Sequence, residues 1–251
     1  MSHQINITEN GTTTLATAGK YCDRNIDVNV EVQSGFLNDA DKVVDGTISG
    51  DYISDKVTSL RGYAFYACAN LSSVSLPNCT SIAASAFRNC TALESVNLPS
   101  CTSFNGAQCF DGATNLKTIN TSSLTTIAEG TRTFANCKYL EEFNAPNLTS
   151  ITGSTSNMFN TCTKLRKVNL PRLSGTTISA NTFNYCSNLT VLVLGGNELN
   201  PLDNVNAFNS SAIKSGTGYV YVPDALVDTY KTATNWSNFA DQIKPISELE
   251  E

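Results

Sequence analysis

The most regular feature of the sequence is a spacing of large apolar residues that returns every 22 to 25 positions. A Phe opens each unit, and Leu, Val or Ile follow at fixed distances among Ser, Thr and Asn. The repeat phenylalanines are Phe65, Phe87, Phe110, Phe134, Phe159 and Phe183, and a truncated seventh unit begins at Phe208. A period of this length predicts stacked repeats, because one unit alone cannot bury its apolar side chains.

Each unit combines two apolar spacings. With the repeat Phe as position 0, a small residue stands at +3 and Leu at +6, as in Cys68 and Leu71. This spacing predicts a helical or 3₁₀ turn, since residues three apart share one side of such a turn. An aliphatic residue or Phe at +9 and usually Leu at +11 predict a short strand, with position +10 facing outward.

A second extended segment completes the unit. Prolines mark the corner after the first strand in four units, and the apolar residue near +17 follows a Thr-Ser-Ile type triplet. The residues near +17 are Ile82, Phe104, Ile127 and Ile151. We therefore expect an α/β solenoid of about six repeats over residues 57–200, with short parallel strands and helical or 3₁₀ turns.

The N-terminal part follows a different pattern. Residues 1–34 contain a turn signal at Asn10-Gly11 and a strict alternation from Ile26 to Val32, which predicts a small β element. This element is either a cap for the solenoid or a module that attaches it to a larger assembly. Residues 35–56 are expected to be a solvated connection and first cap, in which Thr47-Ile48-Ser49 could already form a degenerate first strand.

The repeat pattern degenerates near Gly195-Gly196, so residues 201–251 are expected to hold a last, incomplete repeat and a C-terminal helical cap. Residues 219–222 predict a strand, and 225–236 predict an amphipathic helix. The apolar face of this helix continues through Phe239 and Ile243. Such a cap would protect the open end of the parallel stack, because an exposed sheet edge invites association.

Charge and hydropathy exclude several functional classes. Only 15% of the residues are charged, the net charge is −6, and no Lys/Arg cluster marks a nucleic-acid site. No stretch approaches the roughly 20 apolar residues of a membrane span, so membrane insertion is not expected. The first residues lack the basic and apolar regions of a secretory signal peptide.

The nine cysteines are best explained by the repeat. Five of them occupy position +3, and Ala113 fills the same position in the third unit, which indicates a small buried slot. Buried thiols are therefore expected, whereas disulfides along the stack are disfavoured but not excluded, because neighbouring Cβ vectors would run parallel. No metal site is expected, since metal-ligand spacings are absent and His3 is the only histidine.

Catalytic residues and cofactors are likewise not expected. A carboxylate pair could be assembled from Glu94, Glu141 and Glu142. Their positions at +7 and +8 are more simply explained as solvated charges at the strand. No histidine lies within the repeats to activate a nucleophile, and phosphate-binding motifs are missing.

The outward position +10 supplies the candidate binding residues. It holds Asn97, Asn120, Asn144 and Asn169 in four successive units. One interpretation is that their amides bond to one another along the stack and rigidify it. The other is that they form a polar strip for a glycan or a protein. Lys117 and Arg166 flank this strip at +7, where ligand choice could be tuned.

The unit AF-x-x-C-x-x-L-x-x-V-x-L-P-x-C-T-S-I resembles the BspA-like leucine-rich repeats of bacterial surface proteins. The resemblance covers about residues 57–245, and it departs from the pattern at Ala113, at Thr121 and after Leu194. It implies a leucine-rich-repeat solenoid used for adhesion or recognition. More weakly, residues 7–32 are similar to segments that precede repeats in phage and prophage proteins.

The sequence leaves three alternative functions. The first is a non-catalytic module that recognises a host or cell-surface protein or glycan through its repeat sheet. The second is a structural spacer or assembly part of a surface or virion structure, and the third, an enzyme, has the least support. We expect a protein that is secreted, on the cell surface or associated with a virion, and its oligomeric state is left open.

Overall fold

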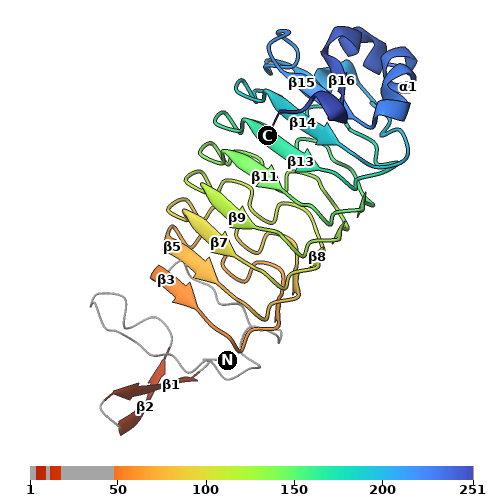
Figure 1. Cartoon of the computed structure of the whole chain (residues 1–251). Helices are drawn as coiled ribbons and strands as arrows, with labels where there is room; N and C mark the ends of the chain where they lie inside the picture. The colour runs from red at the N-terminus through yellow and green to blue at the C-terminus, as the bar shows by residue number, and fades with distance from the viewer. Residues whose placement is uncertain (1–3, 10–11, 18–47, 251) are drawn as a thin grey trace.

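The computed structural model describes residues 4–9, 12–17 and 48–250. Residues 48–250 form an elongated solenoid in which parallel strands stack one above another (Figure 1). One side is built from two consecutive sheets in chain order, and we call the surface that these strands turn away from the core the outer face. The first sheet contains β3 (Ser49–Ile53), β5 (Asn70–Ser75), β7 (Ser95–Asn97) and β9 (Thr118–Asn120). The second contains β11 (Glu142–Asn144), β13 (Lys167–Leu170), β14 (Val191–Leu194), β15 (Tyr219–Val222) and β16 (Ile243–Pro245).

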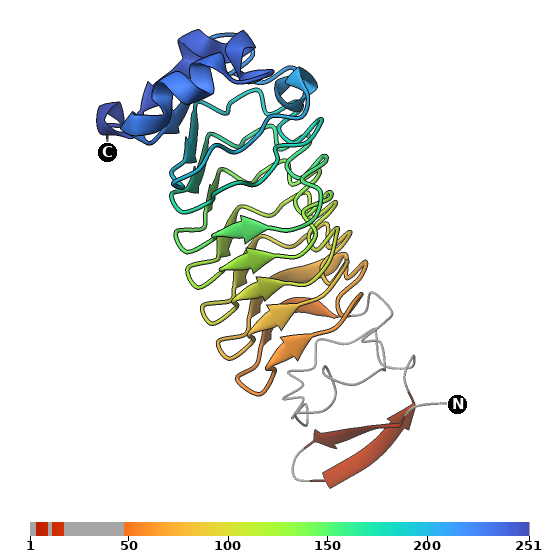
Figure 2. The same ribbon diagram turned by 90° about the vertical axis from the view of Figure 1, so that its right-hand side faces the viewer.

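A narrow third sheet forms another side of the solenoid (Figure 2). Its two-residue strands are β4 (Ser59–Leu60), β6 (Ser81–Ile82), β8 (Ser103–Phe104), β10 (Thr126–Ile127) and β12 (Ser150–Ile151). The register aligns Leu60, Ile82 and Phe104, so that the apolar residues near +17 form one buried column. The sequence prediction of a second extended segment is therefore confirmed.

The turns that carry the repeat Phe are not helical, which corrects the expectation from the 0, +3, +6 spacing. Hydrogen bonds do close between residues three apart, as from the Cys68 amide to the Phe65 carbonyl. Residues at −2 and +2 nevertheless adopt positive φ and interrupt any helix. Only the seventh unit, where position −2 is not left-handed, forms a 3₁₀ helix, η1 (Val205–Phe208).

These left-handed residues allow successive turns to bond to one another. In the first unit the amides of Tyr63, Phe65 and Ala67 donate to carbonyls of the next unit at 3.0, 2.7 and 2.8 Å. The same pattern recurs along the stack, with Phe134 donating to the Met158 carbonyl at 2.8 Å. The turns are thus joined by an almost continuous hydrogen-bonded ladder, which satisfies backbone groups that a helix would have satisfied internally.

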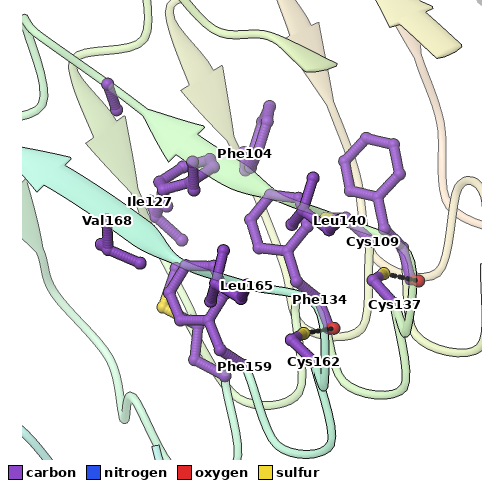
Figure 3. Packing of buried hydrophobic residues seen from close by; sticks show 14 of the residues in the cluster. Phe104, Cys109, Ile127, Phe134, Cys137, Leu140, Phe159, Cys162, Leu165 and Val168 are labelled. Carbon is purple, nitrogen blue, oxygen red and sulfur yellow. Dashed lines mark hydrogen bonds between the residues drawn. The ribbon is translucent and has the colours of Figure 1, made fainter. Parts of the chain in front are cut away.

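The repeat phenylalanines form a stacked column through the centre of the solenoid. Neighbouring rings from Phe65 to Phe208 have centroids 5.1 to 5.5 Å apart and planes within 9° of parallel. Tyr52 meets one end of the column edge-on, and Trp236 and Phe239 cover the other. Figure 3 shows the middle of this column, where Phe134 and Phe159 lie beside the leucines at +6. Stacking therefore buries what a single unit leaves exposed.

The cysteines at +3 are buried thiols, as the repeat pattern predicts. Four of these thiols donate to the carbonyl of the repeat Phe in the preceding unit. Cys137 Sγ donates to the Phe110 carbonyl at 3.2 Å and Cys162 Sγ to the Phe134 carbonyl at 3.0 Å (Figure 3). In the same way Cys90 Sγ donates to the Phe65 carbonyl and Cys186 Sγ to the Phe159 carbonyl. The thiols thus satisfy carbonyl groups within the core.

The buried thiols make the stability of the fold sensitive to alkaline pH. Burial raises the pKa of the Cys186 thiol to about 12, and burial with the nearby Cys101 raises that of Cys109 to about 12. In the unfolded chain these thiols ionise near pH 8.5, so above this pH the unfolded state binds fewer protons than the folded state. The stabilisation is complete below about pH 8.5 and is lost progressively as the pH rises toward the folded pKa.

We expect the free energy of unfolding to be nearly constant from about pH 7 to 8 and to fall steeply above about pH 9. Urea denaturation in the presence of a reductant, repeated across this range, measures it. The variant Cys186→Ala should show a shallower fall, by up to about 1.4 kcal/mol per pH unit, and Ala113 shows that this slot accepts Ala. A flat profile up to about pH 10.5 would contradict the prediction.

The N-terminal boundary of the solenoid lies earlier than predicted. β1 (Gln4–Glu9) and β2 (Thr12–Thr17) pair antiparallel, so the described part of residues 1–34 contains a small β element. The strand predicted over residues 26–32 lies outside the described residues. The expected connection over 35–56 is partly wrong, because β3 already pairs with β5 and places Tyr52 in register with the core residue Val74. The degenerate first strand is real but is centred a few residues later.

The stack continues beyond residue 200, where the sequence predicts a last, incomplete repeat, and this repeat is more complete than expected. Phe208 joins the aromatic column, Ser211 takes the buried slot at +3, and β15 pairs in parallel with β14. The seventh unit appeared truncated in the sequence because Lys214 stands at +6. In the structure Ile213 is buried instead.

The cap contains less helix than the sequence predicts. η2 (Asp224–Leu226) leads into α1 (Val227–Thr232), and after a break come η3 (Trp236–Gln242), β16 and η4 (Ile246–Glu248). Asn235 has a φ of 64° and separates α1 from η3. Ile243, expected on the helix face, instead lies in β16, which adds a last parallel strand to the sheet beside Val220.

Candidate functional site

The outer face carries side chains in two rows. Positions that alternate with the core residues point outward, and the parallel register aligns them from strand to strand. The outward residues of β5 and β7 are serines and asparagines, whereas those of β13 to β15 are Lys, Asn, Val and Tyr. In the described part of the chain no helix lies over β5 to β11, whereas η4 and the residues after it lie in front of the C-terminal end of this face, beside β14 and β15 (Figure 1 and Figure 2). The residues of the face remain exposed or half-buried with few exceptions.

The four candidate asparagines form a hydrogen-bonded ladder in two segments. Asn97 Nδ2 donates to Ser75 Oγ at 3.1 Å, and Asn120 Nδ2 donates to Asn97 Oδ1 at 2.9 Å. Asn169 Nδ2 donates to Asn144 Oδ1 at 2.9 Å. The structural interpretation of the row thus has direct geometric support. Because each amide can form further bonds, the ladder still presents donors and acceptors to solvent.

The ladder is interrupted between β9 and β11, and so is the sheet. These two strands form no backbone pairing, and Asn120 Oδ1 accepts a bond from the Ser122 amide instead of one from Asn144. The Thr121 hydroxyl donates to the Asn144 carbonyl at 2.7 Å. Thr121 is the residue at which the sequence departs from the repeat. Its side chain therefore replaces a backbone bond at the boundary of the two sheets.

The two candidate cations are both paired. Lys117 Nζ lies 2.8 Å from Glu94 Oε2, and Arg166 Nη1 lies 2.7 Å from Glu142 Oε1. All four side chains are exposed, so each pair contributes on the order of 0–1 kcal/mol to stability. The acids are thus part of surface ion pairs that cross from one unit to the next. Lys117 and Arg166 lie near different segments of the ladder and are not brought together.

A shallow hollow lies where the second sheet begins. It has a volume of about 90 Å³ and is lined by Glu142, Phe143, Asn144, Lys167 and Asn169. Small-molecule sites usually measure about 300–1,000 Å³, so this hollow is too small to enclose a substrate. Recognition on this face would therefore use an open surface.

Sequence reasoning missed the aromatic end of the face. Tyr219 and Tyr221 alternate with the buried Val220 and Val222, and both tyrosines therefore point outward from β15. Their ring centroids lie 6.4 Å apart, and Lys244 Nζ lies 5.8 Å from the centroid of the Tyr219 ring. The alternation Tyr-Val-Tyr-Val was a sufficient signal, since aliphatic residues occupy the core register in β13 and β14.

A buried charge lies on the turn side, away from the outer face. The Asp111 carboxylate accepts two hydrogen bonds from Arg132, at 3.1 and 3.0 Å, and one from Asn136 at 3.2 Å. Arg88 Nε lies 3.6 Å from the same carboxylate. The group links three neighbouring units and is enclosed by its partners, which indicates a structural role.

The described residues contain neither a cluster of metal ligands nor a helix that could cross a membrane. Over 4–9, 12–17 and 48–250, no three His, Cys, Asp or Glu side chains gather as a metal site. In the same residues no helix is long and apolar enough to cross a membrane.

Comparisons with known proteins find related structures at low identity. A leucine rich repeat protein of T. pallidum is 23% identical, with a TM-score of 0.49, and the match covers 71% of this chain and 80% of that one. A leucine rich cell surface protein from Faecalibacterium prausnitzii is 20% identical, with a TM-score of 0.44 and coverage of 72% and 65%. A leucine-rich repeat protein from Bacteroides ovatus is 14% identical, with a TM-score of 0.29 and coverage of 80% and 84%. No curated protein matches the sequence.

The family comparison is more informative. The BspA type leucine rich repeat region matches residues 48–152 and 122–220, in six copies. These intervals include all the strands from β3 to β14 and the first half of β15, so they also agree with the wider solenoid limits seen in the structure. The chain belongs to the BspA type leucine-rich repeat family.

Proposed function

We propose that this chain is a non-catalytic recognition module that is displayed on a bacterial surface and binds a protein or a glycan through its outer face. The observation that carries the proposal is the open part of the outer face from β5 to β11, where rows of exposed side chains run along the strands with no described element above them. Solenoid proteins use such extended surfaces for binding. Membership of the BspA type family supports a recognition role and a surface location.

A non-catalytic role agrees with the chemistry of the described residues. The thiols are buried, and their raised pKa values keep them protonated at neutral pH. A nucleophilic cysteine instead needs a lowered pKa and an exposed position. Glu94 and Glu142 are held by cations and lie beside no enclosing cavity.

The test is binding of the full-length protein to arrays of glycans and extracellular proteins, followed by variants. We expect saturable binding that the double variant Lys117→Glu, Arg166→Glu weakens by about tenfold or more, equal to about 1.4 kcal/mol. Each reversal leaves two acids side by side on the outer face.

The matched control is Lys138→Glu, Arg172→Glu, which makes the same change of charge at exposed positions outside the strands. Binding should be unchanged in this variant. Equal weakening in both variants would point to a nonspecific charge effect and contradict the proposal. Absence of binding, with self-association of the full-length protein, would favour the structural spacer.

A further inference from the structure

The corner that follows strand β8 contains the pair Asn105-Gly106. The Asn105 amide donates to the Ile82 carbonyl at 2.7 Å, which continues the hydrogen bonds of the narrow sheet by one residue. The Asn105 side chain is exposed, and neither it nor the Gly106 amide forms a hydrogen bond with any described residue. A side-chain amide and the backbone nitrogen that follows it are therefore both available for reaction with each other.

Close packing requires glycine at position 106. A Cβ atom there would lie 2.7 Å from the Ala84 Cβ and 2.9 Å from the Ala84 Cα, which is closer than real Cβ atoms approach. The backbone of one unit thus passes directly over that of the preceding unit, which glycine permits. Position 105 is less constrained, because Ala83 and Ala128 occupy it in the neighbouring units. The fold therefore fixes the glycine of this pair and leaves the asparagine exchangeable.

A similar pair in the same unit, Asp111-Gly112, is protected by the fold. The Gly112 amide donates to the Ala135 carbonyl at 2.8 Å, so its nitrogen is engaged in the ladder of the turns. The Asp111 carboxylate is buried and accepts three hydrogen bonds from side chains of the next unit. Neither reacting group is available here.

Asn115 shows the opposite combination. Its side chain is exposed and forms no hydrogen bond with the described residues, as at Asn105. Leu116 follows it, however, and the Leu116 amide donates to the Ala113 carbonyl at 3.1 Å. The side chain of Leu116 and the engaged amide both hinder attack on the asparagine. Asn105-Gly106 lacks each of these kinds of protection.

We propose that Asn105 is a site of spontaneous deamidation, a modification that is independent of the proposed recognition function. Asparagine is among the thermolabile residues of proteins. A hydroxide ion removes the proton of the Gly106 amide, and the nitrogen attacks Cγ of Asn105. The N–Cγ bond forms while the Cγ–Nδ2 bond breaks, and Nδ2 takes a proton from water and leaves as ammonia. A succinimide ring remains.

Water then opens the ring in one of two ways. Attack at Cγ breaks the new bond and gives aspartate at position 105. Attack at the backbone carbonyl carbon breaks the original peptide bond and gives isoaspartate, in which the chain runs through Cγ. Both products carry a carboxylate where the protein had a neutral amide.

Isoaspartate at this corner weakens the contact between two units. It lengthens the backbone by one atom immediately before Gly106, at the point where the chain passes over Ala84. The next carbonyl, that of Ala107, accepts a hydrogen bond from the Ser85 amide at 3.0 Å, and the longer backbone displaces it. Aspartate changes the charge and keeps the backbone. A loss of stability should therefore accompany isoaspartate rather than aspartate.

The test is prolonged incubation of the reduced full-length protein at about pH 8, where the buried thiols remain protonated, followed by digestion in mild acid and tandem mass spectrometry. The peptide between Arg88 and Lys117 contains Asn105, Asn115 and Asp111 together, so it carries its own controls. We expect Asn105 to deamidate at least about ten times faster than Asn115, a barrier lower by about 1.4 kcal/mol. The rate should rise with pH, and Asp111 should form no isoaspartate.

Asn105→Gln is the matched variant, because it keeps an exposed amide but moves it one methylene further from the Gly106 nitrogen. Urea denaturation of the incubated protein should show a second transition at lower urea, in proportion to the isoaspartate content, and the variant should not develop it. Isoaspartate without this transition would contradict the proposed effect on the contact between units.

Protein incubated in concentrated urea shows whether the reaction is detected when the fold is absent. There Asn105 should react, and Asp111 should also begin to form isoaspartate. If Asn105 reacts in urea but no faster than Asn115 in the folded protein, the corner protects the pair and the proposal is overturned.

Reaction of Asp111 in the folded protein at the rate of Asn105 would likewise overturn it, because the free amide of Gly106 would then not be what selects the site.

Discussion

Replacing Phe134 with Ala is expected to lower the free energy of unfolding by about 4 kcal/mol, the largest effect of any single change considered. Phe134 is fully buried in the middle of the aromatic column. Its ring stacks on Phe110 and Phe159 at 5.3 Å each and meets Phe143 at 4.8 Å. Truncation leaves a cavity between two units and removes both stacking contacts, so it weakens two interfaces of the solenoid at once.

Urea denaturation followed by far-ultraviolet circular dichroism measures this loss. Phe134→Leu keeps most of the volume without the ring and should cost markedly less. Tyr185→Ala removes a ring that is 54% exposed and should change stability by no more than about 0.5 kcal/mol. A loss below about 1 kcal/mol for Phe134→Ala would show that the column does not hold the units together.

The repeating part of the fold could be predicted because each buried column has its own period in the sequence. Position +3 holds small residues and position +9 holds aliphatic residues or Phe, and both proved to be core positions. The stacking of the repeat Phe follows directly from this regularity. Asparagine at +10 also predicted the outward ladder, since alternation fixes which side of a strand a residue occupies.

The interruptions could not be predicted, because they depend on side chains that replace backbone bonds. Thr121 closes the gap between β9 and β11 through its hydroxyl group. In the same way the buried column near +17 changes from Ile151 to Thr176 and then to Asn200, where the narrow sheet ends. In the sequence, a polar residue at an apolar position looks like the end of the repeat pattern, because the sequence does not show which groups it bonds to.

The limits of the solenoid are hard to recognise in the sequence for a similar reason. Beyond Leu194 the spacing of apolar residues shifts by one, and Ile213 rather than the residue at +6 fills the core. A three-residue strand such as β16 leaves too little alternation to be told from a helix face. The outward tyrosines of β15 could have been predicted from the sequence, because tyrosine and valine alternate clearly in this strand.

Asn200→Ala is expected to lower the free energy of unfolding by about 3 kcal/mol and to release the C-terminal cap. Asn200 is fully buried. Its Oδ1 accepts from the Thr176 amide at 2.9 Å, and its Nδ2 donates to the Leu173 carbonyl and to Tyr230 Oη at 3.1 Å each. Alanine would leave the buried Thr176 amide without this bond, at a cost of about 1–3 kcal/mol. It would also remove the bond to Tyr230 Oη and one of the two bonds that the Leu173 carbonyl accepts, the other coming from the Gly196 amide.

The cap meets this residue through two of its three large aromatic side chains, Tyr230 and Trp236, which both bond to Asn200. Tyr230 Oη also accepts from the Asn200 amide at 2.9 Å, and Trp236 Nε1 donates to the Asn200 carbonyl at 2.8 Å. Trp236 is the only tryptophan in the chain, so its fluorescence reports on the cap alone. We expect Asn200→Ala to shift the emission toward longer wavelength at urea concentrations that leave the circular dichroism of the repeats unchanged.

Asn197→Ala is the matched control, because Asn197 is exposed and accepts a hydrogen bond from Ser174 at 2.9 Å. It should cost less than about 0.5 kcal/mol and leave the emission of Trp236 in place. If Asn200→Ala instead unfolds in a single transition at the concentration of the unaltered protein, apolar contacts of Trp236 and Phe239 with Phe208 hold the cap without the buried amide. Thr176 and Asn200 would then only terminate the narrow sheet, and the aromatic column would be what holds the C-terminal cap on the solenoid.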